Sequence, residues 1–274
     1  MNQGIQIMKR QVYFISDRTG ITAETLGQGL LTQFPTMEFK RQTFRYVDSM
    51  DKARKVVQEI LAQSQANGRP IIMSTLIDDE IREVFNHSGM MLIDLFGTFI
   101  GPLEEELDMA SSHKVGHTHG RVDDVSYAER IEAVNYTIGH DDGLNTRHYD
   151  RADVILVGVS RSGKTPTSLY MAMQYGIEAA NYPLTEDDLM NGELPKVLQS
   201  YRRKLFGLTI DPVRLSQIRS ERMQDSHYAS LRQCQSEVAN AEALYRKYAI
   251  THIDVSQMSV EEIATTLIDR LHLD

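Results

Sequence analysis

The stretch VILVGVSRSGKT, residues 154–165, decides the fold of this chain. Its first four residues are apolar and read as a buried strand, and residues 166–175 after it read as a helix. Between them, GVSRSGKT matches G-x-x-x-x-G-K-[ST], the pattern of a phosphate-binding loop. Strand, loop and helix in this order are the context in which the pattern predicts phosphate binding.

The residue types of this loop suit the phosphates of a nucleotide. Glycines let backbone N–H groups curl around an oxyanion, and the helix N-terminus adds partial positive charge. The Lys164 ammonium would reach the terminal phosphates, and the Thr165 hydroxyl would hold Mg²⁺. We therefore expect eight residues to bind the nucleotide: Gly158, Val159, Ser160, Arg161, Ser162, Gly163, Lys164 and Thr165.

Composition bounds the class of protein. The 274 residues are 41% hydrophobic and 24% charged, as in a globular protein of one large or two ordinary domains. A net charge of −9 argues against nucleic acid and anionic membranes as partners. The single cysteine, Cys234, excludes an internal disulfide, and the apolar runs are too short for a signal-peptide core or a membrane span. We expect a cytoplasmic protein.

Strands alternate with helices along the chain, which predicts an α/β fold with parallel sheets. On the first helix, we expect Leu26, Leu30, Leu31 and Phe34 to form the core face. Strands are expected at 11–16, 43–47, 71–77, 90–95, 154–157, 177–181, 204–211 and 250–255. We divide the chain into an N-terminal parallel α/β unit (1–110), a connecting helix and loops (111–150), and a P-loop kinase-like α/β domain (151–274).

Asp211 is the next candidate for the site. It ends an apolar run that reads as a strand, and P-loop enzymes need a carboxylate at the tip of a neighbouring strand to hold Mg²⁺. Asp211-Pro212 equally fits a helix start, with Asp at the N-cap and Pro first in the helix. Both roles are compatible. On the following helix, Arg214, Arg219 and Arg222 form either a solvated face or, for at least one of them, a counter-charge for phosphoryl transfer.

Two histidine-containing loops are further candidates. His140-Asp141-Asp142 offers a base and two carboxylates, enough to deprotonate a hydroxyl nucleophile. The same residues also fit a plain loop after a helix, with Gly143 in a left-handed conformation. The other loop contains His113, His117 and His119, which fit a metal site, contacts to a phosphorylated substrate, or an ordinary surface.

Residues 16–20, Ser-Asp-Arg-Thr-Gly, follow the first predicted strand. Parallel sheets place their ligand-binding loops at this end of a strand. A plain turn followed by a threonine cap explains the same residues nearly as well.

With these motifs laid out, the chain resembles, nearly end to end, the bifunctional regulatory proteins of phosphoenolpyruvate synthase and of pyruvate, phosphate dikinase. GVSRSGKTPTSLY followed by AANYP is specific to that family, and Ser162 departs from it where related chains often carry cysteine. The closer likeness is to the branch that regulates the synthase. The motifs that carry the resemblance are ISDRTGITAE (15–24), GHTHGR (116–121), GHDDG (139–143), residues 158–183, KLFGLTIDP (204–212) and YASLRQC (228–234).

The resemblance implies a pair of opposed reactions on phosphoenolpyruvate synthase. One transfers the β-phosphoryl of ADP to a threonine of the synthase, which inactivates it and releases AMP. The other removes that phosphoryl by attack of inorganic phosphate, giving pyrophosphate. For this chain it implies nucleotide binding at Gly158–Thr165. From the residues themselves we expect Lys164 to stabilise transition-state charge, Thr165 and Asp211 to hold Mg²⁺, and Asp141 or His140 to act as the base.

Two other functions fit the residues. A small-molecule P-loop kinase would use the same loop and trailing arginines. A nucleotide-gated binding module without catalysis would use Lys164 for affinity alone. The sequence leaves the oligomeric state open, with a homodimer among the options.

Overall fold

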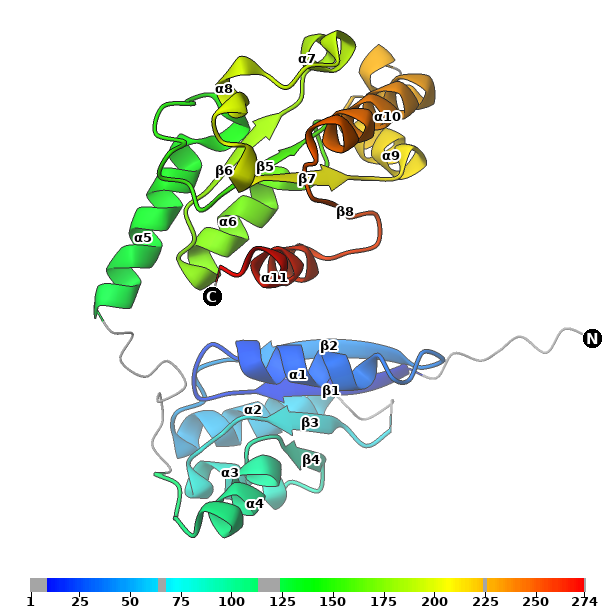
Figure 1. Cartoon of the computed structure of the whole chain (residues 1–274). Coiled ribbons are helices and arrows are strands. Elements are labelled where there is room, and N and C mark those ends of the chain that lie inside the picture. Colours follow the sequence, from blue (N-terminus) through cyan, green and yellow to red (C-terminus); the bar gives the residue numbers. More distant parts are fainter. Residues whose placement is uncertain (1–8, 64–67, 113–123, 224–225, 274) are drawn as a thin grey trace, which may run out of the picture. The chain divides into compact units, whose positions relative to one another are not determined.

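The structure is a computed structural model that describes residues 9–63, 68–112, 124–223 and 226–273. The chain splits into two compact units, Met1–Arg121 and Val122–Asp274. Helix α5 (Asp124–Gly139), which we had placed in a connecting segment, packs against helix α6 (Lys164–Tyr175) of the second unit. Figure 1 shows the elements of each unit.

The first unit is a four-stranded parallel sheet of order β2-β1-β3-β4. Because β1 lies between β2 and β3, the chain order reverses direction at β1, which makes the β1–β3 boundary a topological switch point. Helices α2 and α3 pack on the face of Tyr13 and Ile15, and α1 packs on the opposite face. Its elements are β1 (Lys9–Ile15), α1 (Ile21–Leu31), β2 (Glu38–Phe44), α2 (Met50–Gln63), β3 (Ile71–Ser74), α3 (Asp79–Asn86), β4 (Met91–Asp94) and α4 (Gly97–Leu107).

The predicted core face of α1 is wrong except for Leu31. Leu26, Leu30 and Phe34 are 38%, 43% and 57% exposed. The buried face consists of Ala23, Gly27 and Leu31, and a Cβ built on Gly27 would lie 2.3 Å from Phe14 Cε1. The helix therefore approaches the sheet too closely for large side chains, and small residues decide which face is buried.

The second unit is also a parallel four-stranded sheet, of order β6-β5-β7-β8. The central strand β5 is buried along its whole length. Helices α5 and α11 both pack against α6, and α9 packs against α10 on the other face of the sheet (Figure 1). The strands are β5 (Val154–Gly158), β6 (Ala179–Pro183), β7 (Leu205–Thr209) and β8 (His252–Asp254). The other helices are α6 (Lys164–Tyr175), α7 (Glu186–Asn191), α8 (Lys196–Gln199), α9 (Pro212–Arg222), α10 (Leu231–Tyr248) and α11 (Val260–Leu271), with 3₁₀ turns η2 (Asp141–Gly143), η3 (Arg202–Lys204) and η4 (His227–Ala229).

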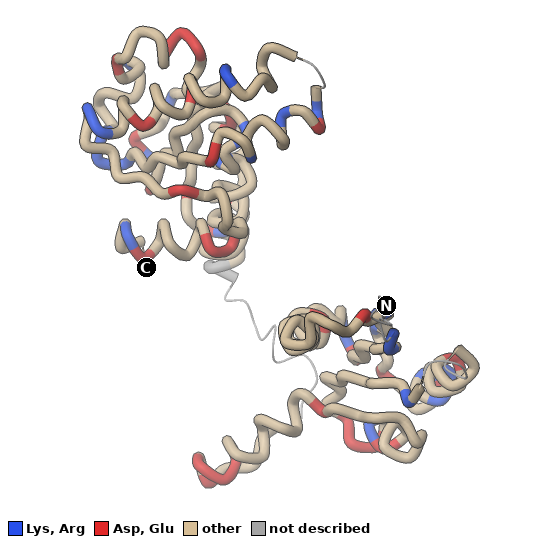
Figure 2. The backbone as a smooth tube through the Cα atoms, turned by 90° about the vertical axis from the view of Figure 1, so that its right-hand side faces the viewer, with Lys and Arg blue, Asp and Glu red and all other residues tan. Residues whose placement is uncertain are grey.

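The two parallel sheets confirm the predicted α/β class. Acidic and basic residues are scattered over both units, as Figure 2 shows. Over the described part of the chain, no helix combines the length and apolar content needed to cross a membrane.

Candidate phosphate-binding site

The loop between β5 and α6 has the backbone of an anion-binding turn. Arg161 and Gly163 adopt left-handed conformations, with φ of 75° and 86°. Such turns point successive backbone N–H groups toward one side, where they form an anion-binding concavity. No side chain caps the N-terminus of α6 within the described residues, so its first-turn N–H groups are left for a ligand.

Gly158 lets the loop leave the sheet. A Cβ on Gly158 would lie 2.7 Å from the Leu208 carbonyl oxygen and 2.8 Å from Ser162 Oγ. Ser162 is 1% exposed, so its side chain packs inside the loop and not on its outer surface. We expected Ser162 to bind the nucleotide, and this burial limits its contact with a ligand to the backbone.

Lys164 lies within the loop and is 4% exposed. Its Nζ donates a hydrogen bond of 2.9 Å to the Val159 carbonyl oxygen. Burial lowers the pKa of Lys164 to about 8, and the charges of Asp142 and Asp141 oppose that shift. A bound phosphate would add to those negative charges and favour the ammonium form.

Thr165, Asp141 and Asn181 join three separate segments. Thr165 Oγ1 donates a 2.8 Å hydrogen bond to Asp141 Oδ1, and the Asn181 amide donates to the same oxygen. Asn181 Oδ1 in turn accepts from the backbone N–H of Asp142 at 3.1 Å. The loop after α5 is thereby fixed beside the start of α6. We had not predicted a role for Asn181, which is fully buried in the neighbouring strand β6.

A cavity of about 250 Å³ opens beside the loop. It combines the carboxylate of Asp142 with the arginines Arg161 and Arg222, so Arg222 is the one of the three predicted α9 arginines that reaches it. Its lining residues are Asp142, Ser160, Arg161, Gly163, Lys164, Thr165, Pro166, Ile218 and Arg222.

His140 directly precedes Asp141 in the sequence, but both of its ring nitrogens contact backbone carbonyl groups outside the phosphate loop. Its Nδ1 lies 2.7 Å from the Tyr136 carbonyl oxygen and its Nε2 lies 2.8 Å from that of Arg147. Its ring also stacks on Tyr136, with centroids 4.0 Å apart. The base role of His140 stays a prediction, and these contacts favour a role in shaping the loop that holds Asp141.

Asp211 lies after β7, which is hydrogen-bonded to β5, as the sequence predicts. Its carboxylate accepts hydrogen bonds from the backbone N–H groups of Val213 and Arg214, at 3.0 and 2.9 Å. The predicted helix cap is thus confirmed. Asp211 is not among the residues that line the cavity. Its role in holding Mg²⁺ stays a prediction.

The oxygen atoms beside the loop suit Mg²⁺ better than a softer metal. Thr165 supplies a hydroxyl, and Asp141 and Asp142 supply carboxylates, which are the ligand types that Mg²⁺ takes. Among the described residues, no group of three or more His, Cys, Asp and Glu side chains could hold a metal alone. Mg²⁺ at this position would therefore need phosphate oxygens and waters as its remaining ligands.

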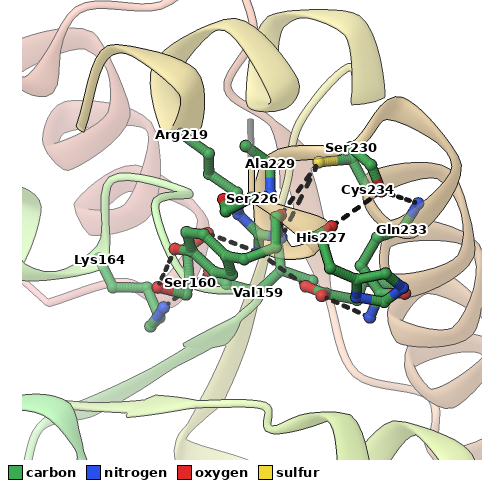
Figure 3. A network of polar contacts seen from close by, with 12 residues as sticks. Val159, Ser160, Lys164, Arg219, Ser226, His227, Ala229, Ser230, Gln233 and Cys234 are labelled. Atoms are coloured by element: carbon green, nitrogen blue, oxygen red, sulfur yellow. Dashed lines mark hydrogen bonds and ion pairs between the residues drawn. The ribbon is translucent and has the colours of Figure 1, made fainter. Parts of the chain in front are cut away.

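Arg219 contacts the backbone of the phosphate-binding loop at Ser160 (Figure 3). It is fully buried, forms a 2.7 Å ion pair with Glu237, and donates a 3.0 Å hydrogen bond to the Ser160 carbonyl oxygen. Its guanidinium lies 4.0 Å from the ring centroid of Tyr228, whose hydroxyl donates to Ser160 Oγ at 2.9 Å. Arg219 thus acts on the loop backbone, whereas Arg214 is exposed. His113, His117 and His119 lie outside the described residues.

The fold and the loop define an α/β protein with a P-loop sequence at the carboxyl end of a central parallel strand. The model of the kinase/pyrophosphorylase family matches residues 12–268, and the chain belongs to that family.

Relatives of this chain are named phosphoenolpyruvate synthase regulatory proteins. One from Alkalilimnicola ehrlichii is 55% identical over 267 residues, 97% of each chain. One from Halorhodospira halophila is 54% identical over 94% of this chain and 95% of its own. One from Hahella chejuensis is 52% identical over 95% and 96%. A solute-binding protein from Burkholderia multivorans matches among solved structures at 9% identity, over 89% of this chain and 96% of that one. Its TM-score of 0.23 is too low to indicate a shared fold.

Proposed function

We propose that this chain regulates phosphoenolpyruvate synthase by two opposed phosphoryl transfers at the phosphate-binding loop. In the first, the hydroxyl oxygen of a synthase threonine attacks the β-phosphorus of ADP. The bond from that phosphorus to the α–β bridging oxygen breaks, AMP leaves, and the hydroxyl proton passes to a base. The synthase is inactivated.

In the second transfer, an oxygen of inorganic phosphate attacks the phosphorus of the phosphothreonine. The bond from phosphorus to the threonine oxygen breaks, that oxygen takes a proton, and pyrophosphate leaves. The synthase is restored. Both transfers need one phosphate group held in the loop, either the β-phosphate of ADP or the attacking phosphate.

The observation that carries the proposal is the grouping of Lys164, Thr165 and Asp141 at one end of β5. A buried ammonium, the free N–H groups of α6 and a carboxylate meet there beside an open cavity. Positive charge and N–H donors stabilise a transferring phosphoryl group, and a carboxylate can accept the proton of the attacking hydroxyl. We assign Asp141 as the base that accepts the proton of the attacking hydroxyl, with Asp142 as the second carboxylate of the loop.

Mg²⁺ bound by Thr165 would neutralise charge on the phosphate oxygens. Within the chain, Thr165 and Asp141 hold one another in place, and Asn181 donates a second hydrogen bond to the same oxygen of Asp141. The names of the relatives point to the synthase as the protein acceptor.

The test uses ADP labelled at the β-phosphate, incubated with the full chain and phosphoenolpyruvate synthase. We expect label on a synthase threonine together with AMP, and we expect added inorganic phosphate to release the label as pyrophosphate. Lys164→Ala should slow the labelling by about a hundredfold or more. Lys55→Ala, a change at an exposed lysine of α2, is the matched control.

Two other outcomes would replace the proposal. Label that reaches a small metabolite without any protein acceptor identifies a small-molecule kinase. Inhibition of the synthase without a phosphoprotein, retained by Lys164→Ala at saturating nucleotide, identifies a nucleotide-gated binding module.

A further inference from the structure

The first unit has a preformed loop of its own at the switch point of its sheet. Residues 16–20 follow β1, and β3 lies beside β1. The loop is held to the segment after β2, because Tyr46 N–H donates to the Arg18 carbonyl oxygen and Val47 N–H donates to that of Ser16, both at 3.0 Å. In open parallel sheets, this position is where ligands bind.

Asp17 is buried in this loop with one oxygen unused. The residue is 7% exposed, and the backbone N–H of Ile77 hydrogen-bonds to its carboxyl group. Its Oδ2 is buried and has no hydrogen-bond partner within the described residues. A buried acceptor left unpaired costs free energy, so a donor from a ligand would relieve that cost.

A cavity of about 20 Å³ lies next to this carboxyl group. Asp17 and Thr75, which is 3% exposed, line it, together with Arg18 and Thr22. A volume of this size holds about one water-sized group. The enclosed part of the site therefore fits a single oxygen of a ligand, and the rest of the ligand would lie at the exposed side chains of Arg18 and Thr22.

The start of α1 supplies positive charge to the same place. The helix begins after Gly20, whose φ is 80°, and no side chain caps it within the described part of the chain. Its first-turn N–H groups therefore favour an anion, and together with Arg18 they disfavour a bare cation. A Cβ on Gly20 would lie 2.9 Å from Thr43 Cγ2, so this close approach depends on glycine.

The site thus favours an anion that also carries a hydrogen-bond donor. We propose that the loop 16–20 binds inorganic phosphate, whose remaining P–OH group donates to Asp17 Oδ2 while its other oxygens accept from the N-terminus of α1 and from Arg18. Hydrogen phosphate keeps one proton at neutral pH. Sulfate has none to donate, and a phosphate monoester, whose second pKa is about 6, has mostly lost that proton at pH 7.5.

Hydrogen exchange on the full chain tests this site separately from the phosphate loop. Peptides covering residues 16–24 and 158–165 are followed in phosphate, in sulfate and in glycerol 3-phosphate at matched ionic strength and pH 7.5, with Lys164→Ala as background to weaken the second site. We expect phosphate to slow exchange in 16–24 at concentrations about tenfold lower than sulfate or the monoester does. That difference in affinity corresponds to one hydrogen bond to a charged group.

Asp17→Asn should abolish that preference, because an amide can serve a proton-free oxyanion equally well. Asp51→Asn, at an exposed aspartate of α2, should retain it. Thermal unfolding of Asp17→Asn checks that the unit stays folded, as expected when a buried carboxyl group with one unpaired oxygen is replaced by an amide. Equal protection by sulfate in the parent chain would mean an adventitious anion at a helix end and would overturn the proposal, as would protection confined to 158–165. Absence of phosphate protection at 158–165 in the chain that keeps Lys164 would instead contradict the proposed function.

Discussion

The hydroxyl of Thr165, in the first turn of α6, donates a 2.8 Å hydrogen bond to Asp141 Oδ1 in the loop that follows α5. These residues are 24 positions apart in the chain. The bond places beside the phosphate loop a carboxylate that belongs to no strand of the sheet. Asp141 therefore has two proposed roles, as the proton acceptor and as the anchor of its loop, and a substitution at Asp141 can separate them.

Asp141→Asn should lower the rate of synthase phosphorylation by about 10² to 10⁴, since general-base catalysis contributes that much. The amide can still accept from Thr165, so ADP affinity should change little. The measurement is a kcat and KM comparison with labelled ADP. Asp187→Asn, at an exposed residue of α7, is the control and should leave both constants unchanged. An Asp141→Asn rate equal to the parent's would move the base elsewhere.

ADP binding should take up a proton above pH 8. In the free chain burial holds the pKa of Lys164 at about 8, so the amine is mostly neutral at pH 9. Bound phosphates favour the ammonium form and raise that pKa, and the proton comes from solvent. Calorimetry at pH 9 in two buffers of different ionisation enthalpy measures the uptake. Lys164→Met should show none from this group, and equal uptake in both chains would contradict the assignment.

Breaking the Arg219–Glu237 pair should destabilise the second unit strongly. Arg219→Met leaves Glu237, whose side chain is 12% exposed, without its cation, a change that costs about 3–5 kcal/mol in buried pairs. Tyr228→Phe removes only the hydroxyl that donates to Ser160 Oγ and should cost about 1 kcal/mol. Urea unfolding measures both. Arg214→Met, at an exposed position of α9, should stay close to the parent.

Two glycines of α1 should respond in opposite directions to the same substitution. Gly27→Ala places a methyl group 2.3 Å from Phe14 Cε1 and 2.7 Å from Met73 Sδ, and overpacking of this kind costs about 1–3 kcal/mol. Gly29 has open space around its Cα, so Gly29→Ala should stabilise by about 0.4–1 kcal/mol. Thermal unfolding of the two variants gives the signs. A stabilising Gly27→Ala would show that α1 lies farther from the sheet.

The phosphate loop and the parallel sheets were predictable, because their signals are local. The pattern from Gly158 to Thr165 specifies a strand–loop–helix unit by itself, and the capping box of Ser259 and Glu262 marks the start of α11 in the same way. Asp211 as the cap of α9 followed from the next residue, Pro212.

Features that depend on packing were not predictable. The core face of α1 could not be found by counting apolar residues, because Gly27 lies on that face and only a residue without a side chain fits against Phe14 there. Counting apolar residues would also fail on α5, where Tyr127, Ile131 and Ile138 are 58%, 44% and 60% exposed. The role of Asn181 in fixing Asp141 needed the register of β6, since no sequence pattern links residues 40 positions apart.

The direction of the Thr165 hydrogen bond has a consequence for which ligand atom can meet that side chain. A hydroxyl has one proton, and Thr165 donates its proton to Asp141. Only lone pairs remain on Oγ1, so the atom attracts electron-poor partners and repels phosphate oxygens. The start of α6 thus offers two polarities: its backbone N–H groups would suit an anion, and the threonine oxygen would suit a cation that bridges to that anion.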